Sequence, residues 1–176
     1  MTEIQLSRGK VALVDEGDLP RLLRYGRWRA FYSDGVWYAS GYALDRTTKP
    51  TFVLMHRLIL GLSKKDPPVD HRNGDGLDNR RSNLRLASAT LNNANHRGYP
   101  SRRRSPYKGV SWLRNAKLRA GGQWRATIKP SAKAKQSVRY APTEIEAAVE
   151  YNRLALQKFG TWSCLNLVPC SWPERV

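Results

Sequence analysis

The first half of the chain alternates short apolar runs with polar turns, a pattern that predicts small sheets joined by short helices. Residues 9–15 and 35–44 are β-branched or aromatic runs bounded by glycine and aspartate, and each predicts a strand. Residues 18–28 between them predict a short helix, with Asp18 as the N-cap and Pro20 in the first turn.

A longer apolar run, residues 51–62, fits either a strand followed by a helix or a single buried helix, and Asp66-Pro67-Pro68 ends it. The next segment, residues 69–98, is rich in asparagine and arginine and has few apolar side chains that could fill a core. Residues 97–106 then predict a charged linker bounded by prolines.

The pattern beyond residue 107 predicts three short strands, at residues 107–112, 122–130 and 136–140. In the second strand, apolar side chains alternate with polar and cationic ones, as expected where one face is buried. In the third, we expect Ser137 and Arg139 on the polar face and Gln136, Val138 and Tyr140 on the other. Three large side chains of this sheet are expected in the core: Trp124, Val138 and Tyr140.

Residues 142–160 predict a long helix. Thr143 and Glu146 have the spacing of a capping box, Gly160 stands at the end, and an apolar stripe recurs at helical spacing. The fold class expected is α+β, with an N-terminal mixed α/β region followed by a small three-stranded antiparallel sheet packed on one helix. The expected organisation is an N-terminal domain (1–96), a basic linker (97–106), a C-terminal domain (107–170) and a tail (171–176).

Charge narrows the class of partner. The 31 Lys and Arg residues outnumber the 14 Asp and Glu residues, which gives a net charge of +17 and a pI near 10.5. No acidic residue occurs between Asp78 and Glu144, so the cationic surplus is concentrated in the second half. Such a surplus favours a polyanionic partner, most often nucleic acid.

The cysteines and the apolar runs argue against a disulfide-rich, zinc-knuckle, secreted or membrane protein. Cys164 and Cys170 are too few for a disulfide framework and do not have zinc-knuckle spacing, so we expect both to be reduced. The N-terminus lacks the apolar core of a signal peptide, and no run approaches the length of a membrane span. These features predict a cytoplasmic protein without a membrane partner.

The segment "VDHRNGDGLDNRRSNLRLASATLNNANHRG" holds residues suited to phosphodiester hydrolysis, which needs an activated water and a cation beside the phosphate. A histidine such as His71 suits the base role because its unperturbed pKa lies near neutrality. Asp70 precedes it and points the other way on an extended chain, so it can hold a metal. Asn83 lies on the expected return strand of a hairpin. Ser88 then caps a short helix on which three residues share a face: Asn92, Asn95 and His96.

This segment resembles the ββα-metal motif of HNH endonucleases (here residues 66–97), in the branch found in phage and intron-associated homing enzymes. The resemblance implies His71 as the general base and Asn83 as the residue that orients it. It also implies Asp70 and Asn92 as ligands of one divalent metal. The position of Asn92 is often a histidine in the family, and an asparagine there favours oxygen-ligated Mg²⁺, or Mn²⁺, over zinc. No structural zinc is expected.

Four further polar residues are expected to support the site without reacting: His56, Asn79, Asn95 and His96. His56 lies on an apolar segment, where a lone histidine is more often a packed core residue than a catalyst. Asn79 and Asn95 are expected to tie the loop and helix together through side-chain hydrogen bonds. For His96 we expect a phosphate-facing or solvent-facing role.

The second half resembles the plant ethylene-response-factor (Apetala-type) DNA-binding domain, from Tyr107 to Leu167. That resemblance implies a sheet laid in the major groove, with outward side chains on bases and phosphates. The first hairpin is longer than in the plant pattern and Ser111 replaces its usual arginine, so base preference cannot be transferred. Candidate DNA contacts, with the arginines of the linker, are Lys108, Arg114, Gln123, Arg125, Thr127, Lys129, Arg139, Arg102, Arg103 and Arg104.

Together these resemblances imply a metal-dependent, site-specific DNA endonuclease of the homing type, borne by a phage or other mobile element. We expect it to act on double-stranded DNA as a monomer without an obligate protein partner. One site is enough to nick one strand, and a double-strand break would need a second site or a second visit. The alternative is a DNA-binding regulator whose nuclease part has lost activity. RNA binding is disfavoured because the sequence lacks the exposed aromatic platforms of RNA-binding modules.

Overall fold

The computed structural model describes residues 2–43, 51–96, 105–114, 117, 121–131 and 133–169. The chain is an α+β protein with two compact units, Met1–Asn92 and Asn93–Val176, which are described separately. The division falls inside a helix, whereas the sequence analysis ended the first domain at residue 96. Residues 97–104 of the expected linker and the expected tail lie outside the described residues.

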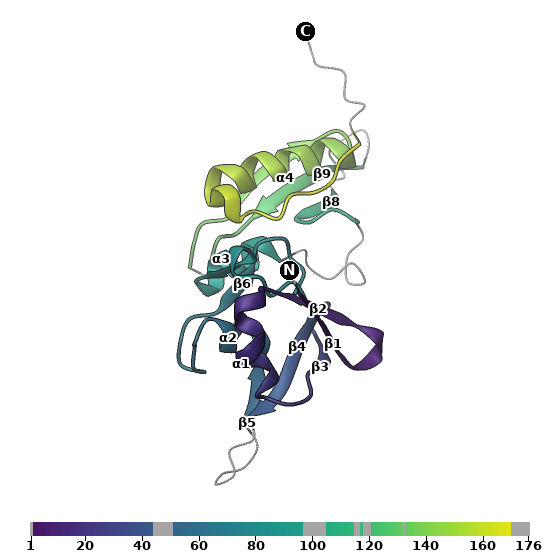
Figure 1. Ribbon diagram of the computed structural model, residues 1–176. Helices are drawn as coiled ribbons and strands as arrows, with labels where there is room; N and C mark the ends of the chain where they lie inside the picture. Colours follow the sequence, from purple (N-terminus) through teal and green to yellow (C-terminus); the bar gives the residue numbers. More distant parts are fainter. Residues whose placement is uncertain are drawn as a thin grey trace. The chain divides into compact units, whose positions relative to one another are not determined.

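The described part of the N-terminal unit contains three small antiparallel sheets (Figure 1). One is the pair β1–β2, one has the order β3-β4-β5, and the last is the hairpin β6–β7. Strand β4 is the longest and pairs on both sides. The strands are β1 (Thr2–Gln5), β2 (Val11–Val14), β3 (Arg29–Ser33), β4 (Val36–Ala43), β5 (Thr51–Leu54), β6 (Val69–His71) and β7 (Leu84–Leu86).

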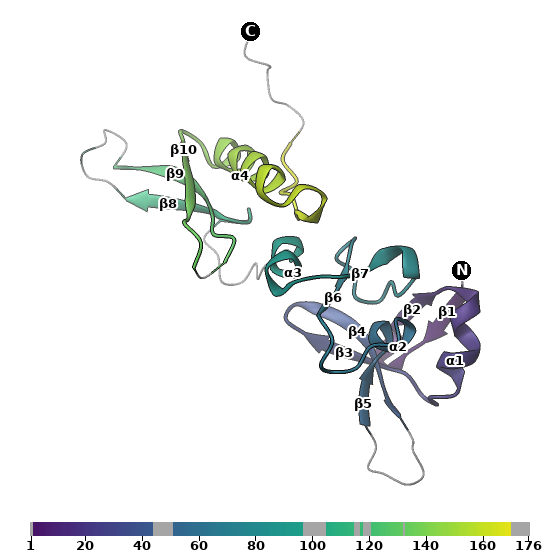
Figure 2. The ribbon, with the colours of Figure 1, turned by 90° about the vertical axis from the view of Figure 1, so that its left-hand side faces the viewer.

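Short helices connect these strands. Helix α2 packs against β4 and β5 (Figure 2). The core beneath them is formed by side chains that include Ile4, Val14, Leu22, Trp28, Met55 and Ile59. No helix within the described ranges is long and apolar enough to cross a membrane. The helices are η1 (Ser7–Gly9), η2 (Glu16–Asp18), α1 (Leu19–Leu23), α2 (Met55–Ile59), η3 (Arg81–Asn83) and α3 (Ala89–Asn95).

The C-terminal unit is a three-stranded antiparallel sheet packed on helix α4 (Figure 1). Its elements are β8 (Val110–Arg114), β9 (Gly122–Ile128), β10 (Ser137–Ala141), α4 (Glu144–Phe159) and η5 (Gly160–Trp162), with β9 in the middle. The core between sheet and helix includes Ala126, Ile128 and Tyr151. Gly109 has a φ of +71°, and a Cβ there would lie 2.2 Å from the Tyr151 ring, so only glycine fits.

Several sequence predictions are confirmed. Residues 51–62 form a strand followed by a helix, which was the first of the two alternatives. The hairpin, the three C-terminal strands and the capping box of α4 are also present. The sequence analysis missed β1 and β3. Asp18 precedes α1 as expected, but its carboxylate binds Arg81 instead of capping the helix.

The residues of β10 divide between two faces as expected, but the prediction that Val138 and Tyr140 lie in the core is wrong. Val138 pairs with Thr127 and Tyr140 pairs with Arg125, so both lie on the outward, polar face of the sheet. Tyr140 is accordingly 54% exposed instead of buried. The reason is the register between β9 and β10, which places Arg139 opposite the buried Ala126. Of the three side chains expected in this core, Trp124 does pack against it.

Candidate active site

The hairpin β6–β7 separates Asp70 and His71 onto opposite faces. Strand pairing places Asp70 opposite Arg85 and His71 opposite Leu84. Because side chains alternate along a strand, the Asp70–Arg85 pair occupies one face and His71 shares the other with Leu84. The sequence analysis expected this separation, and the geometry confirms it.

Asp70 forms a nearly buried ion pair. Nε of Arg85 lies 2.7 Å from Oδ2 of Asp70, and the side chains of Arg85 and Asp70 are 9% and 5% exposed. Two buried charges are tolerable only where each offsets the other's loss of hydration. Arg85 therefore holds the carboxylate in place. The sequence analysis did not single out Arg85, although its position opposite Asp70 follows from the hairpin register.

The imidazole ring of His71 packs against two other rings, which form a pocket around it. Its ring centroid is 5.9 Å from that of Tyr38 on β4 and 5.0 Å from that of His56 on α2. The rings of His56 and His71 are almost perpendicular, at 88°. All three side chains come from different elements, and the two histidines are buried. The pocket therefore fixes the imidazole plane of His71 by packing.

Burial controls the charge of both histidines. It lowers the pKa of His71 below its usual value, and the opposite effect of the Asn79 side chain and of nearby carboxylates, including Asp70, offsets this only in part. Burial, with a contribution from His71 and Arg57, lowers the pKa of His56 to about 3. A neutral imidazole has a lone pair that can accept a proton. His56 is thus a packed neutral side chain, as expected, but its Nδ1 has no hydrogen-bond partner among the described residues.

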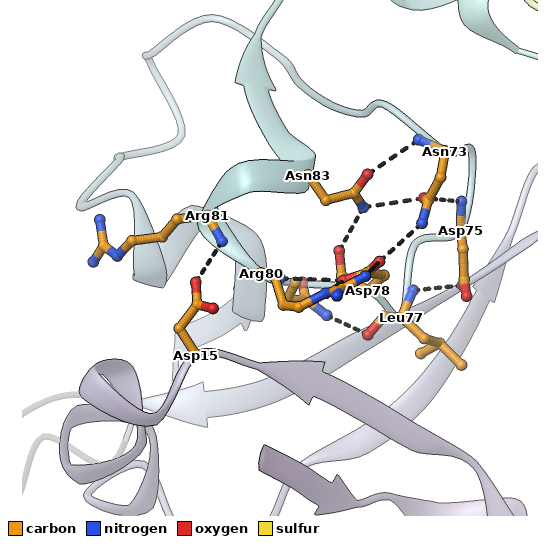
Figure 3. A network of polar contacts seen from close by, with 9 residues as sticks. Asp15, Asn73, Asp75, Leu77, Asp78, Arg80, Arg81 and Asn83 are labelled. Carbon is orange, nitrogen blue, oxygen red and sulfur yellow. Dashed lines mark hydrogen bonds and ion pairs between the residues drawn. The ribbon is translucent and has the colours of Figure 1, made fainter. Parts of the chain in front are cut away.

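The loop between β6 and β7 is ordered by its own polar side chains (Figure 3). Asn73 Oδ1 accepts a hydrogen bond from the Asp75 N–H at 2.9 Å, and Asn73 Nδ2 donates to Asp78 Oδ2 at 2.8 Å. Asp75 Oδ1 accepts from the Leu77 N–H at 2.9 Å. Arg80 binds the same Asp78 carboxylate through Nε at 2.7 Å and Nη2 at 2.6 Å. These bonds satisfy the backbone of a loop that has little apolar surface.

Asn83 belongs to this loop network. Its Nδ2 donates to Asn73 Oδ1 at 3.0 Å and to the Asp78 carbonyl at 2.7 Å, and its Oδ1 accepts from the Asn73 N–H at 3.1 Å (Figure 3). Both amide hydrogens are therefore committed to the loop. The expected role of Asn83 in orienting His71 stays a prediction. A nearby polar side chain that affects His71 is Asn79, which acts to raise the pKa of His71.

The loop is also anchored to the rest of the N-terminal unit. The Asn79 N–H donates to the Leu13 carbonyl at 2.8 Å, and the fully buried Asn79 side chain donates to the Leu77 carbonyl at 3.0 Å. Arg81 binds the Asp18 carboxylate through Nη2 at 2.6 Å, and its N–H donates to Asp15 Oδ2 at 2.8 Å. The Asn79 side chain therefore bonds within the loop, and the expected tie between the loop and helix α3 stays a prediction.

Helix α3 follows the hairpin and carries the other predicted ligand. Ser88 caps it as expected, since Ser88 Oγ accepts from the Leu91 N–H at 3.3 Å. Asn92 is half-buried and Asn95 is buried. A carboxylate at Asp70 and an amide oxygen at Asn92 suit a hard cation such as Mg²⁺, which keeps several waters. The described residues contain no group of three or more His, Cys, Asp or Glu that could hold a metal.

Lys108 has a structural environment that the sequence analysis did not foresee. Its ammonium donates to the carbonyls of Ala94 at 2.6 Å and His96 at 2.5 Å, at the C-terminal end of α3. Its backbone N–H donates to Asn166 Oδ1 at 2.6 Å. A cation is favourable beside the unpaired carbonyls of a helix end. Lys108 therefore caps α3, which competes with its predicted contact to DNA.

The other predicted DNA contacts divide between the two faces of the C-terminal sheet. Gln123, Arg125 and Thr127 share the outward face, where Arg125 Nε donates to Ser111 Oγ at 3.0 Å. Arg114 and Arg139 are exposed but project from the other face by strand alternation. Lys129 is exposed just beyond β9. Arg102, Arg103 and Arg104 lie outside the described residues.

Comparison with known proteins adds no relative: no protein-family model, no curated protein and no solved structure matches this chain.

Proposed function

We propose that the protein is a metal-dependent DNA endonuclease of the ββα-metal type, with His71 as the general base. The observation that carries this proposal is the placement of two consecutive residues. Asp70 is held by a guanidinium on one face of β6, and His71 is fixed between aromatic rings on the other. The hairpin β6–β7 carries Asp70 and His71, and helix α3, which follows it in the sequence, carries Asn92. One continuous segment of the chain therefore contains the proposed base and both proposed oxygen ligands.

Each residue has a defined task in this proposal. His71 takes a proton from the water that attacks the phosphorus, while Tyr38 and His56 fix the ring by packing against it. Asp70 and Asn92 would hold the cation, and Arg85 keeps the Asp70 carboxylate in position. A divalent cation bound there supplies positive charge beside the phosphate and the leaving oxygen. With so few protein ligands, a cation there would also need water and phosphate oxygens as ligands.

The C-terminal unit supplies sequence-dependent binding in this proposal. Its outward face carries Arg125, which Ser111 orients by a hydrogen bond at 3.0 Å. A guanidinium fixed in this way can form the paired hydrogen bonds to a guanine edge that make arginine the commonest base-reading side chain. The net charge of +17 favours the same partner.

One observation favours a second candidate, a DNA-binding regulator without nuclease activity. The Asp70 carboxylate already has a cationic partner in Arg85, which lowers its need for a metal. The two candidates differ in one readout. The nuclease cuts duplex DNA with Mg²⁺ or Mn²⁺ and stops in EDTA, whereas the regulator binds DNA under all three conditions and cuts under none.

The experiment is incubation of the full chain with plasmid and genomic DNA in Mg²⁺, in Mn²⁺ and in EDTA, followed by mapping of the 5′ and 3′ ends. The account expects recurrent nicks at defined positions that need a divalent cation. Cleavage that persists in EDTA contradicts the metal mechanism. Intact DNA under every condition, with site-specific binding retained, establishes the regulator instead.

A further inference from the structure

Three aromatic side chains form a row on one face of the sheet β3–β4–β5. Phe31 on β3 pairs with Tyr38 on β4, and Tyr42 on β4 pairs with Phe52 on β5. Directly paired residues point to the same face, and so do Tyr38 and Tyr42, which are four positions apart in one strand. Phe31, Tyr42 and Phe52, named here the aromatic row, therefore share the face that carries Tyr38.

Two side chains of the aromatic row are exposed and the third, Phe52, is half-buried, although the rings contact one another. Phe31 is 40% exposed and Tyr42 is 44% exposed. The Phe31 and Phe52 rings meet edge to face at 5.5 Å, and the Tyr42 and Phe52 rings at 5.9 Å. Aromatic side chains usually contribute to a core because of the large area that they can bury. A contiguous exposed group instead marks a contact surface.

The aromatic row adjoins the candidate active site through Tyr38. Tyr38, the cross-strand partner of Phe31, has its ring 5.9 Å from that of His71. Gly76 of the hairpin loop also packs on Tyr38, because a Cβ at that position would lie 2.6 Å from its ring. The loop thus covers Tyr38, and Phe31 is the next aromatic side chain outward from the site on this sheet face.

The charge around the row indicates its partner. Arg29 pairs with Ser40, lies on the same face two residues before Phe31, and is exposed. Aromatic faces beside an arginine, on a chain with a net charge of +17, fit a polyanion that also has flat apolar surfaces. Nucleobases attached to a phosphate backbone have both properties, and aromatic side chains bind them by stacking.

We propose that Phe31, Tyr42 and Phe52 form a stacking surface for DNA bases that are unstacked beside the phosphate held at His71. The location beside the cut rests on the function proposed above. Paired and stacked bases do not offer their faces, so this surface favours DNA that is kinked or locally unpaired. The exposed row also corrects the sequence analysis, which expected no exposed aromatic platform.

Binding is measured in EDTA, so that the readout does not depend on cleavage. The full chain is titrated with a duplex oligonucleotide, with the same duplex carrying a short unpaired bubble, and with single-stranded RNA of the same sequence. A 2-aminopurine in the bubble reports base stacking through loss of fluorescence. The parent is expected to prefer the bubble over the duplex by about tenfold, to prefer it over RNA, and to quench the probe.

Phe31→Ala and Tyr42→Ala test the surface directly. Each should bind the bubble about tenfold more weakly and quench less, with duplex affinity unchanged. Phe31→Tyr should retain the preference. The matched control is Tyr32→Ala, because Tyr32 is 56% exposed on the same strand but points to the opposite face, where it packs on Trp37. Thermal melting of each variant establishes that it is folded.

Defined outcomes overturn the proposal. Equal bubble preference in the parent, Phe31→Ala and Tyr42→Ala does so, as does an equal loss in Tyr32→Ala. Tighter binding of RNA, or a change of oligomeric state in the alanine variants without a change in DNA binding, assigns the surface to another partner. A parent that prefers the bubble but never cuts DNA contradicts the nuclease proposal and leaves the stacking surface supported.

Discussion

Arg85 and Asp70 face each other across the hairpin β6–β7, with 2.7 Å between Nε and Oδ2 and with both side chains nearly buried. This pair stands where the proposed cation would bind. A bound cation and the Arg85 guanidinium would both stabilise the Asp70 carboxylate. Loss of Arg85 should therefore increase the stabilisation of the folded protein by a cation.

Arg85→Ala tests this relationship. Removing one member of a buried ion pair leaves a buried charge, and we expect the free energy of unfolding to fall by about 3–5 kcal/mol. Mg²⁺ should then raise the melting temperature of the variant more than that of the parent. Arg153→Ala is the control, because Arg153 is 72% exposed in its pair with Glu150 and should change stability by less than about 1 kcal/mol. Equal Mg²⁺ shifts in Arg85→Ala and in the parent contradict a cation at Asp70.

The buried His56 predicts a loss of stability in acid. Its pKa is about 3 in the folded protein and near 6.5 in the unfolded chain, so the unfolded state binds the proton more readily. The stability associated with neutral His56 is present above pH 6.5 and decreases by about 1.4 kcal/mol per pH unit as the pH falls toward 3. His56→Phe should remove about 2 kcal/mol of the stability difference between pH 6.5 and 5, measured by urea unfolding. Parallel pH curves for variant and parent contradict this prediction.

Asn83→Ala should loosen the hairpin loop. The variant loses the hydrogen bonds that join Asn83 to Asn73 and Asp78, and it leaves a buried carbonyl without a partner, which costs roughly 1–3 kcal/mol. Amide hydrogen exchange at Asn73 should accelerate, and DNA cleavage should slow with little change in DNA affinity. The exposed Asn93 of α3 provides a control in Asn93→Ala. Unchanged exchange at Asn73 would show that the loop is held without Asn83.

Lys108 and Lys129 should behave differently although both were predicted to contact DNA. Lys108→Ala removes the cap of α3 and should lower the melting temperature, with little change in the salt dependence of DNA binding. Lys129→Ala should leave the melting temperature unchanged and reduce the salt slope by about one unit if Lys129 contacts a phosphate. A reduced salt slope in Lys108→Ala would restore Lys108 as a phosphate contact.

The elements with strong local signals were predictable from the sequence. The capping box of Thr143 and Glu146 placed α4, and the alternation around Trp124 placed β9. The hairpin followed from the polar loop between two short apolar runs. Strand β3 was missed although a signal for it exists: Asp34-Gly35, a dipeptide typical of two-residue hairpin turns, separates it from β4.

Features that depend on register and tertiary contact were not predictable. Tyr140 was assigned to the core because periodicity gives two faces without saying which one meets the helix. Within the candidate site, Asp70, His71 and Asn83 were named from the sequence, but Arg85 and Tyr38 were not. Their roles depend on strand pairing and on packing between segments far apart in the chain, which no local pattern specifies.

The role of His71 as the general base can be tested by single-turnover kinetics. The single-turnover rate of DNA cleavage is compared between the parent and His71→Ala, with protein in excess over DNA and with binding measured on the same samples. Asn93→Ala, at an exposed residue of α3 outside the proposed catalytic set, is the control and should keep the parent rate. We expect His71→Ala to slow cleavage by about 10²–10⁴ with DNA affinity nearly unchanged. Cleavage by His71→Ala within a few-fold of the parent rate would contradict it.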